Sequence, residues 1–197
     1  MKNKKRVGIF SGTFDPFHIA HLEACLVARA ACDLGTVLIM VEKKPKRKYE
    51  VSTYKRRVTM VDLATSEFPS LRLIETGKDN ITIDNTLPLL HDQFPGAEYW
   101  YIVGSDIVKH LHTWHKPEKL FNNLKLCVVL RENKDKEDVK AQLASLQKIY
   151  KKLDYKILPE VWSVVSSSKI RTQIKKTGYS PLLHREVMRY ILTKDIY

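Results

Sequence analysis

The sequence predicts an α/β fold in which an open, doubly wound, mostly parallel sheet is covered by helices on both faces. First, short and nearly continuous apolar segments rich in β-branched residues recur along the 197-residue chain, as in parallel strands buried on both faces. Second, segments with apolar residues at helical spacing lie between them. Third, turn formers separate the two kinds of segment. Strands that alternate with helices in this way become parallel through right-handed crossovers.

Five segments are expected to form strands, because each is short, apolar and flanked by turn formers. They are residues 6–10, 36–41, 71–75, 98–103 and 125–130. The intervening segments are expected to be helices. Residues 18–33 place Ile19, Leu22, Leu26 and Ala30 at helical spacing, which predicts a helix there. Similar periodicity predicts helices over 55–66, 83–93 and 136–151.

The C-terminal part of the chain changes character and is expected to be helical. Residues 164–176, VVSSSKIRTQIKK, begin with serines that can cap a helix and continue with Ile170 and Ile174 four residues apart. A second helix is expected over 182–192, after the break at 178–181. With no internal repeat and no long linker, the sequence favours one domain.

The composition points to anionic partners. The formal net charge is +12, and positive charge is concentrated in KNKKR at 2–6 and KKPKRK at 43–48. A nucleic acid, an acidic membrane surface or a phosphorylated small molecule would each suit this charge, which by itself does not choose among them. No apolar run approaches the roughly 18 residues of a membrane span, and no secretory signal is recognised. We therefore expect a soluble, cytoplasmic protein.

The three cysteines are expected to be reduced. An odd number of cysteines without a CxxC pair is typical of free thiols in a reducing compartment rather than of a disulfide framework. We interpret them as small core residues. They are Cys25, Cys32 and Cys127.

The stretch SGTFDPFHIAH at 11–21 directly follows the first expected strand. In an open α/β sheet, ligands bind beyond the carboxyl ends of the strands, where the strand order reverses. Gly12 permits close approach of the backbone, and Thr13 offers a hydroxyl group. The pair Asp15 and Pro16 turns the chain into a helix whose free N–H groups and dipole attract anions.

Two histidines stand at the start of that helix. His18 and His21 are three residues apart, so they lie on nearly the same face, where two imidazoles can donate hydrogen bonds to phosphate oxygens. Histidines in such a pattern also cap or pack without taking part in chemistry. A zinc site built from Asp15, His18, His21 and Cys25 is disfavoured, because the neighbouring backbone suits anions and no HExxH glutamate is present.

A second candidate anion site lies in VSSSKIR at 165–171. Serines at a helix N-terminus followed by Lys169 and Arg171 provide hydroxyls, backbone donors and two cations within a few turns. Alone, this pattern is also compatible with an ordinary helix cap on a basic surface. Its significance is that it is the second such site in the chain.

Taken together, these motifs resemble the nucleotidyltransferase superfamily with an HxGH motif, and specifically the nicotinate or nicotinamide mononucleotide adenylyltransferases. The resemblance extends over nearly the whole chain. It rests on SGTFDPFHIAHL at 11–22, YKRRVTMVDLA at 54–64, TL at 86–87, IVGSDIVKHLHTWHKPEKLF at 102–121, VSSSKIR at 165–171 and the closing segment 176–197. It implies a Rossmann-like fold and a single nucleotidyltransferase domain over 1–197, with a C-terminal helical part from about 164 to 197.

The resemblance implies adenylyl transfer from ATP to nicotinate mononucleotide, or to nicotinamide mononucleotide, in the biosynthesis of NAD. Mg²⁺ would accompany ATP, held mostly by phosphates and water. The implied partners are these small molecules; a membrane and a nucleic acid are not expected, and a homo-oligomer is left open. A bacterial-like length favours nicotinate mononucleotide as the acceptor.

The resemblance also implies roles for individual residues. His18 and His21 would face the triphosphate of ATP, with His21 nearest the α-phosphate. Arg171 would act with them as a catalytic residue and would help to hold the outgoing pyrophosphate. The implied residues for ATP and its phosphates are Gly12, Thr13, Phe14, Ser167, Ser168 and Lys169, and those for the nucleotide ribose and the acceptor are Thr86, Gly104, Asp106 and Trp114.

The chain departs from the family pattern at three places. Ala20 stands where the family often has glycine, residues 81–83 do not reproduce the usual aromatic residue or threonine, and the loop VEKKPKRKYE at 41–50 is more basic than its bacterial counterparts. Adenylyl transfer is therefore better supported than the identity of the acceptor. A sister nucleotidyltransferase acting on phosphopantetheine or glycerol phosphate stays open. So does a non-catalytic nucleic-acid-binding protein that uses the two basic clusters.

Three histidines in KHLHTWH at 109–115 invite a metal assignment. They are His110, His112 and His115. Spacings of two and three residues suit no common closed zinc site, so a metal there is not expected. Trp114 among them has a simpler role against a ring or the core.

Overall fold

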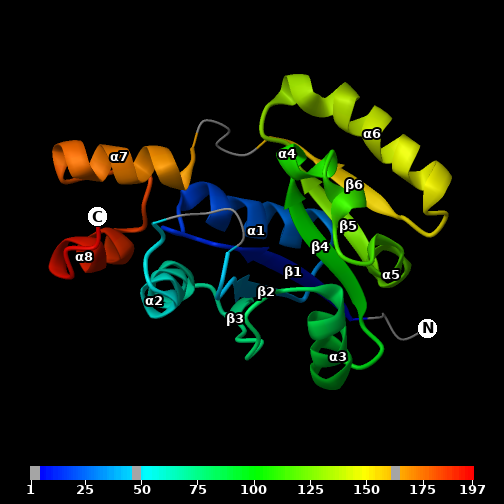
Figure 1. Ribbon diagram of the computed structural model, residues 1–197, viewed down its shortest axis with the longest axis horizontal. Helices are drawn as coiled ribbons and strands as arrows, with labels where there is room; N and C mark the ends of the chain where they lie inside the picture. Colours follow the sequence, from blue (N-terminus) through cyan, green and yellow to red (C-terminus); the bar gives the residue numbers. More distant parts are fainter. Residues whose placement is uncertain (1–4, 46–49, 161–164) are drawn as a thin grey trace.

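A six-stranded parallel sheet forms the centre of the molecule (Figure 1), as seen in a computed structural model that describes residues 5–45, 50–160 and 165–197. The order of the strands is β3-β2-β1-β4-β5-β6, so the order reverses between β1 and β4. This is the predicted doubly wound α/β fold. The strands are β1 (Arg6–Gly12), β2 (Thr36–Val41), β3 (Leu71–Leu73), β4 (Glu98–Gly104), β5 (Leu124–Val129) and β6 (Tyr155–Leu158).

The inner parts of the central strands are apolar because the sheet is buried on both faces. In β2, Val37, Ile39 and Val41 belong to the core on one face of the sheet, whereas Leu38 and Met40 belong to the core on the other. Successive side chains of a strand point to opposite faces, so a strand that is covered on both sides needs an apolar residue at every position. The sequence analysis recognised these strands because apolar and polar residues do not alternate along them.

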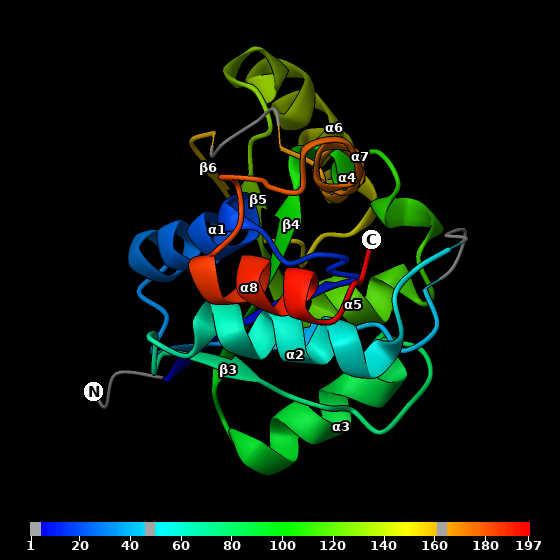
Figure 2. The same cartoon turned by 90° about the vertical axis from the view of Figure 1, so that its left-hand side faces the viewer.

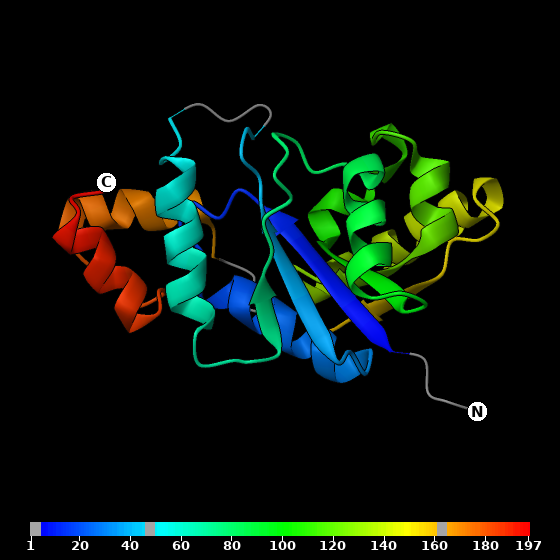
Figure 3. The same ribbon diagram turned by 90° about the horizontal axis from the view of Figure 1, so that it is seen from below.

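Two groups of helices cover the two faces (Figure 3). The first core includes side chains of α1 (Ile19–Ala31), α2 (Tyr54–Thr65), α7 (Ser167–Thr177) and α8 (Arg185–Thr193). The second includes side chains of α3 (Ile83–Gln93), α4 (Ser105–Val108), α5 (Pro117–Asn123) and α6 (Lys136–Ile149). Short 3₁₀ turns, η1 (Leu111–Thr113) and η2 (Asn133–Asp135), complete the described elements.

The C-terminal helices lie at the end of the sheet that carries the first loop. Helix α8 packs beside α2, and α7, which precedes α8 in the chain, lies above α8 in Figure 2. The backbone N–H of Ile19 donates to the carbonyl oxygen of Leu182 at 3.1 Å, which ties the start of α1 to the segment between α7 and α8. Within the described part of the chain, no helix combines the length and the apolar character that crossing a bilayer requires.

The predicted strands and helices are present with bounds that differ by a few residues at most, whereas the short helices α4 and α5, between β4 and β5, were not predicted. The helix over 83–93 has the predicted bounds, whereas β3 ends at Leu73 rather than at residue 75. Strand β6 was not predicted. It is four residues long and lies at the edge of the sheet, where it pairs with β5, and three of its four residues are not buried, so it lacks a continuous apolar run. Helix α7 begins at Ser167; the first residue of the predicted helix, 164, lies outside the described residues.

All three cysteines lie in the core, as predicted. Their side chains are free thiols, and Cys25 and Cys127 are completely buried. Burial raises the pKa of Cys25, because it penalises the thiolate. The sulfur atoms of Cys32 and Cys127 lie 3.3 Å apart, between the end of α1 and strand β5.

Candidate active site

A cavity of about 750 Å³ opens at the carboxyl ends of β1 and β4, where the strand order reverses. This is the position at which open α/β sheets bind ligands, and the volume is that of a small-molecule site. Ten of the thirteen predicted site residues line it: Gly12, Thr13, Phe14, His18, His21, Thr86, Gly104, Asp106, Trp114 and Ser167. The other three, Ser168, Lys169 and Arg171, lie on α7 and are not among the described residues that line the cavity.

The loop that leaves β1 is sharply bent. Phe14 has a φ of 52°, a left-handed conformation that is uncommon for a bulky residue. The next peptide bond but one, between Asp15 and Pro16, is cis. A Cβ atom on Gly12 would lie 2.9 Å from the ring of Phe14, so the bend requires glycine at this position. The loop thereby delivers the chain to the start of α1 within a few residues.

His18 and His21 stack face to face at the N-terminus of α1, as their spacing predicts. Their ring centroids are 3.6 Å apart, with an angle of 17° between the planes. The backbone N–H of His18, the N-cap residue, donates to Nδ1 of His21 at 3.3 Å. Because Nδ1 accepts this bond, the proton of a neutral His21 ring resides on Nε2. His21 is thereby prepared as a hydrogen-bond donor.

An aromatic surround holds the ring of His21. The centroid distances are 5.0 Å to Phe14, 5.2 Å to Phe17 and 5.9 Å to Phe10. The contact with Phe14 is edge-on, at an interplanar angle of 81°. Aromatic walls exclude water, and a hydrogen bond to a charged ligand is stronger in a region of low dielectric constant. The phenylalanines of the motif thus restrict the orientation of His21 and lower the polarity around it.

His18 is a buried neutral imidazole. Its side chain is 3% exposed, and its Nδ1 has no hydrogen-bond partner among the described residues. Burial and, to a smaller extent, the charge of Arg131 lower the pKa of His18 from 6.5 to about 3. Near neutral pH the ring is uncharged, so its contribution at a phosphate would be a directed hydrogen bond rather than a charge.

This lowered pKa predicts an acid-sensitive fold. The unfolded chain takes up a proton on His18 near pH 6.5, whereas the folded protein does so only near pH 3. The free energy of unfolding therefore falls as the pH is lowered from 6.5 towards 3, with a contribution from this group of at most about 1.4 kcal/mol per pH unit. In His18→Gln the number of protons taken up on unfolding should be smaller by up to one, and the slope should be correspondingly shallower. Urea unfolding at several pH values measures this slope.

The matched control for this measurement is His91→Gln. His91 lies exposed on α3, away from the cavity. This variant measures how far the loss of a histidine outside the cavity changes the slope. If His18→Gln has the same slope as the wild type, His18 does not titrate as its burial implies.

The residues predicted to contact the nucleotide ribose and the acceptor line the same cavity as the histidines. Thr86 is 3% exposed, and its Oγ1 has no hydrogen-bond partner within the part of the chain that is described. The ring of Trp114 contacts Tyr101 edge-on at a centroid distance of 5.7 Å. A Cβ atom on Gly104 would lie 2.5 Å from Oδ1 of Asp106, so glycine is needed there for this carboxylate to fold back. A pyridine ring at these residues remains a prediction.

The sequence reasoning missed two charged residues that line the cavity. Arg131 follows β5; its Nε lies 3.2 Å from Oδ1 of Asp106, and its Nη1 donates to the carbonyl of Val165 at 3.4 Å. Glu42 follows β2 and accepts a hydrogen bond from Oγ1 of Thr13 at 3.1 Å. Both residues lie just beyond the carboxyl end of a strand. Ligands of open α/β sheets bind beyond these ends, so a search of the residues that follow every predicted strand would have found both.

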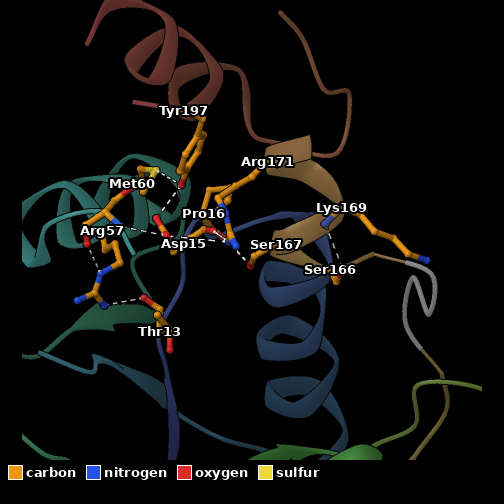
Figure 4. A network of polar contacts seen from close by, with 11 residues as sticks. Thr13, Asp15, Pro16, Arg57, Met60, Ser166, Ser167, Lys169, Arg171 and Tyr197 are labelled. Carbon is orange, nitrogen blue, oxygen red and sulfur yellow. Dashed lines mark hydrogen bonds and ion pairs between the residues drawn. The ribbon is translucent and has the colours of Figure 1, made fainter. Parts of the chain in front are cut away.

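The two predicted anion-binding motifs meet (Figure 4). Oγ of Ser167 donates to the carbonyl of Pro16 at 3.1 Å, and Nη1 of Arg171 donates to the carbonyl of Asp15 at 2.7 Å. Ser166 is the residue that caps α7, since its Oγ accepts from the N–H of Lys169 at 3.3 Å. The start of α7 therefore lies against the loop that precedes α1. Phosphate binding by Ser168, Lys169 and Arg171 stays a prediction.

The histidines of KHLHTWH do not gather around one point. His110 and His115 line the cavity, whereas His112 is exposed on η1. Nε2 of His115 lies 2.9 Å from Oδ2 of Asp84, a carboxylate that Lys116 and Lys119 also contact. These contacts lower the pKa of Asp84.

Comparisons with known proteins identify the family of this chain. The model of the cytidylyltransferase-like family matches residues 9–173. A relative from Neisseria meningitidis serogroup C, named "Probable nicotinate-nucleotide adenylyltransferase", is 31% identical over 201 residues, which cover 98% of each chain. The chain belongs to the nicotinate-nucleotide adenylyltransferase family. A member from Lactococcus lactis with the same name is 33% identical and covers 99% of this chain and 96% of its own.

A solved structure shares the fold of this family member. The nicotinic acid mononucleotide adenylyltransferase of Plasmodium falciparum, complexed with NaAD, superposes with a TM-score of 0.73 at 17% identity. The superposition covers 97% of this chain and 96% of that one. The fold is therefore that of a nucleotidyltransferase from end to end.

Proposed function

We propose that this protein transfers the adenylyl group of ATP to nicotinate mononucleotide, giving the dinucleotide and pyrophosphate. The observation that carries the proposal is the contact between the two predicted anion-binding motifs beside one cavity. The stacked histidines stand at the N-terminus of α1, and Ser167 and Arg171 of α7 contact the loop directly before it. The names of the family's curated members support the same reaction.

The reaction needs no protein nucleophile. An oxygen of the acceptor's 5′-phosphate, already anionic near neutral pH, attacks the α-phosphorus of ATP; the new P–O bond forms as the bond to the β-phosphate oxygen breaks, and pyrophosphate leaves. The difficulty is to bring two anions together, so catalysis consists of placement and charge stabilisation. The N-terminus of α1, the Nε2–H of His21 and the cation of Arg131 would supply this stabilisation.

Magnesium would enter with ATP and neutralise charge on its phosphates. The carboxylates beside the cavity are already engaged: Glu42 accepts from Thr13, and Asp106 pairs with Arg131. A metal carried by phosphate oxygens and water fits such a site. The protein's own task is then to orient the polyphosphate chain.

Three features support nicotinate as the acceptor base. Thr86 presents a buried hydroxyl without a described partner at the cavity wall, and the aromatic side chain of Trp114 lines the same cavity. Lys44 also lines the cavity, although its Nζ lies 2.5 Å from Oδ2 of Asp79. A ring carboxylate would be favoured by such donors and positive charge.

We infer that the reaction takes place in the cytoplasm, where free buried thiols such as Cys32 and Cys127 persist.

A comparison of acceptors tests the proposal. The purified protein is incubated with ATP, Mg²⁺ and one acceptor at a time, and pyrophosphate release is measured. Nicotinate mononucleotide should give the highest kcat/KM, followed by nicotinamide mononucleotide, and omission of Mg²⁺ should abolish release. Release only with phosphopantetheine or glycerol phosphate would assign the protein to a sister activity. No release with any acceptor, together with steeply salt-dependent binding of RNA or DNA, would favour the nucleic-acid alternative.

A further inference from the structure

The loop from Thr13 to Phe17 is held from outside the cavity by a buried polar cluster (Figure 4). Its centre is Asp15, which is 2% exposed and lies between the bent Phe14 and the start of α1. Asp15 is not among the described residues that line the cavity. We call the cluster the Asp15 network. Its members are Asp15, Ser52, Arg57, Arg171 and Tyr197.

The carboxylate of Asp15 joins two distant segments to the loop. The hydroxyl of Tyr197, four residues beyond the end of α8, donates to Oδ1 at 2.8 Å. The backbone N–H of Ser52, just before α2, donates to Oδ2 at 3.1 Å. Burial, and then the charge of Asp15, raise the pKa of Tyr197. The phenol therefore keeps its proton and acts as a donor at every pH at which the enzyme works.

The loop carbonyls are bound on the same outer side. Nη1 of Arg57 donates to the carbonyl of Thr13 at 2.8 Å, and Nη1 of Arg171 donates to that of Asp15 at 2.7 Å. In a trans peptide the next N–H points opposite to the carbonyl, so the N–H of Phe14 points away from Arg57. The network thus pairs the negative ends of the Thr13 and Asp15 carbonyl dipoles with guanidinium cations, and it leaves the N–H of Phe14 on the side of the loop away from Arg57.

We propose that Tyr197 is a positioning residue for adenylyl transfer: through Asp15 it fixes the loop that carries His18 and His21 to the polyphosphate. The inference rests on the proposed function. Tyr197 does not line the cavity, yet its hydroxyl is one of two donors to a carboxylate at the centre of the loop. Loss of that donor lets the loop, and with it the stacked imidazoles, shift relative to ATP. Small displacements of this kind reduce rates strongly.

The first test is Tyr197→Phe, which removes one oxygen and keeps the packed ring. We expect kcat/KM for ATP to fall about tenfold, as for a displacement of a fraction of an ångström, while KM for the mononucleotide stays within a factor of two. The matched control is Tyr190→Phe on α8, since the Tyr190 hydroxyl makes no hydrogen bond within the described residues. This control should retain the kinetic constants of the wild type.

A double-mutant cycle separates positioning from general stability. Asp15→Asn keeps an oxygen that can accept from Tyr197 but removes the charge. If Tyr197 acts through Asp15, the double variant should be no worse than the more impaired single variant. Multiplicative effects would overturn the proposal. A Tyr197→Phe enzyme with unchanged kinetics would also overturn it. So would a Tyr197→Phe enzyme whose KM values for both substrates rise together as its Tm falls, because a general loss of stability would then explain the change.

Binding of a non-hydrolysable ATP analogue distinguishes this proposal from the function on which it rests. Calorimetry with an α,β-methylene analogue should show weaker binding to Tyr197→Phe than to the wild type, and equal binding to Tyr190→Phe. If the wild type releases no pyrophosphate with any acceptor, the proposed function fails, but this comparison still decides whether Tyr197 orders the nucleotide site. Equal analogue affinity in all three proteins would overturn the positioning role.

Discussion

His21→Ala is expected to lower kcat by about 10²-fold or more, the usual effect of removing one donor to a developing negative charge. The ring of His21 is prepared for this role by its neighbours. Its Nδ1 accepts from the backbone of His18, which leaves the proton on Nε2, and Phe14 and Phe17 confine the ring. Because the donor acts mainly in the transition state, KM for ATP should change much less than kcat.

Steady-state kinetics of pyrophosphate release checks this expectation. Circular dichroism and thermal unfolding should first show that the variant is folded. His91→Ala, on the exposed face of α3, is the matched control and should keep wild-type turnover. A stably folded His21→Ala enzyme with normal kcat would remove His21 from the mechanism.

Arg57→Met is expected to destabilise the fold by roughly 3–5 kcal/mol, the range for removing one partner of a buried charged cluster. Arg57 is 1% exposed, and its guanidinium donates to the carbonyls of Thr13, Glu42, Lys43 and Ser52. Methionine fills similar space but leaves these carbonyls without their donor, and an unsatisfied buried acceptor costs about 1–3 kcal/mol. Urea unfolding at pH 7 measures the loss.

The neighbouring Arg56→Met provides the matched control. Arg56 lies on the same helix and is only partly buried, so its replacement should change the free energy of unfolding by no more than about 0.5 kcal/mol. A loss below about 1 kcal/mol in Arg57→Met would show that water replaces the guanidinium at the four carbonyls.

The central strands and their helices were predictable because burial on both faces leaves a simple trace in the sequence. Strand β2 is apolar at every buried position, and the helix over 83–93 begins after the capping residue Thr82. Strand β6 left no such trace, since Tyr155 and Lys156 are not fully buried at the edge of the sheet. A short edge strand becomes recognisable only through its partner, here β5.

The candidate site was predictable where one stretch of chain contains both the turn and the chemical groups. Gly12, His18 and His21 meet this condition. Arg171 was predicted as a site residue from its own helix, but its bond to the carbonyl of Asp15, 156 positions away in the chain, was not. Arg57 and Arg131 were not predicted as site residues, because the contacts that define them cross between segments. Spacing reveals which groups share a helix face, but not which distant backbone a cation will bind.

The bond between Asp15 and Tyr197 spans 182 positions, and this has a consequence for biogenesis. At roughly 5–20 residues per second, a ribosome needs on the order of 10 s or more between the two residues. During that interval the nascent chain can pair β1 with β2, yet the first core still lacks the side chains of α8, and the turn after β1 still lacks the bond from Tyr197. The loop after β1 therefore gains its full set of hydrogen bonds only after α8 has been synthesised, well after the sheet has begun to assemble.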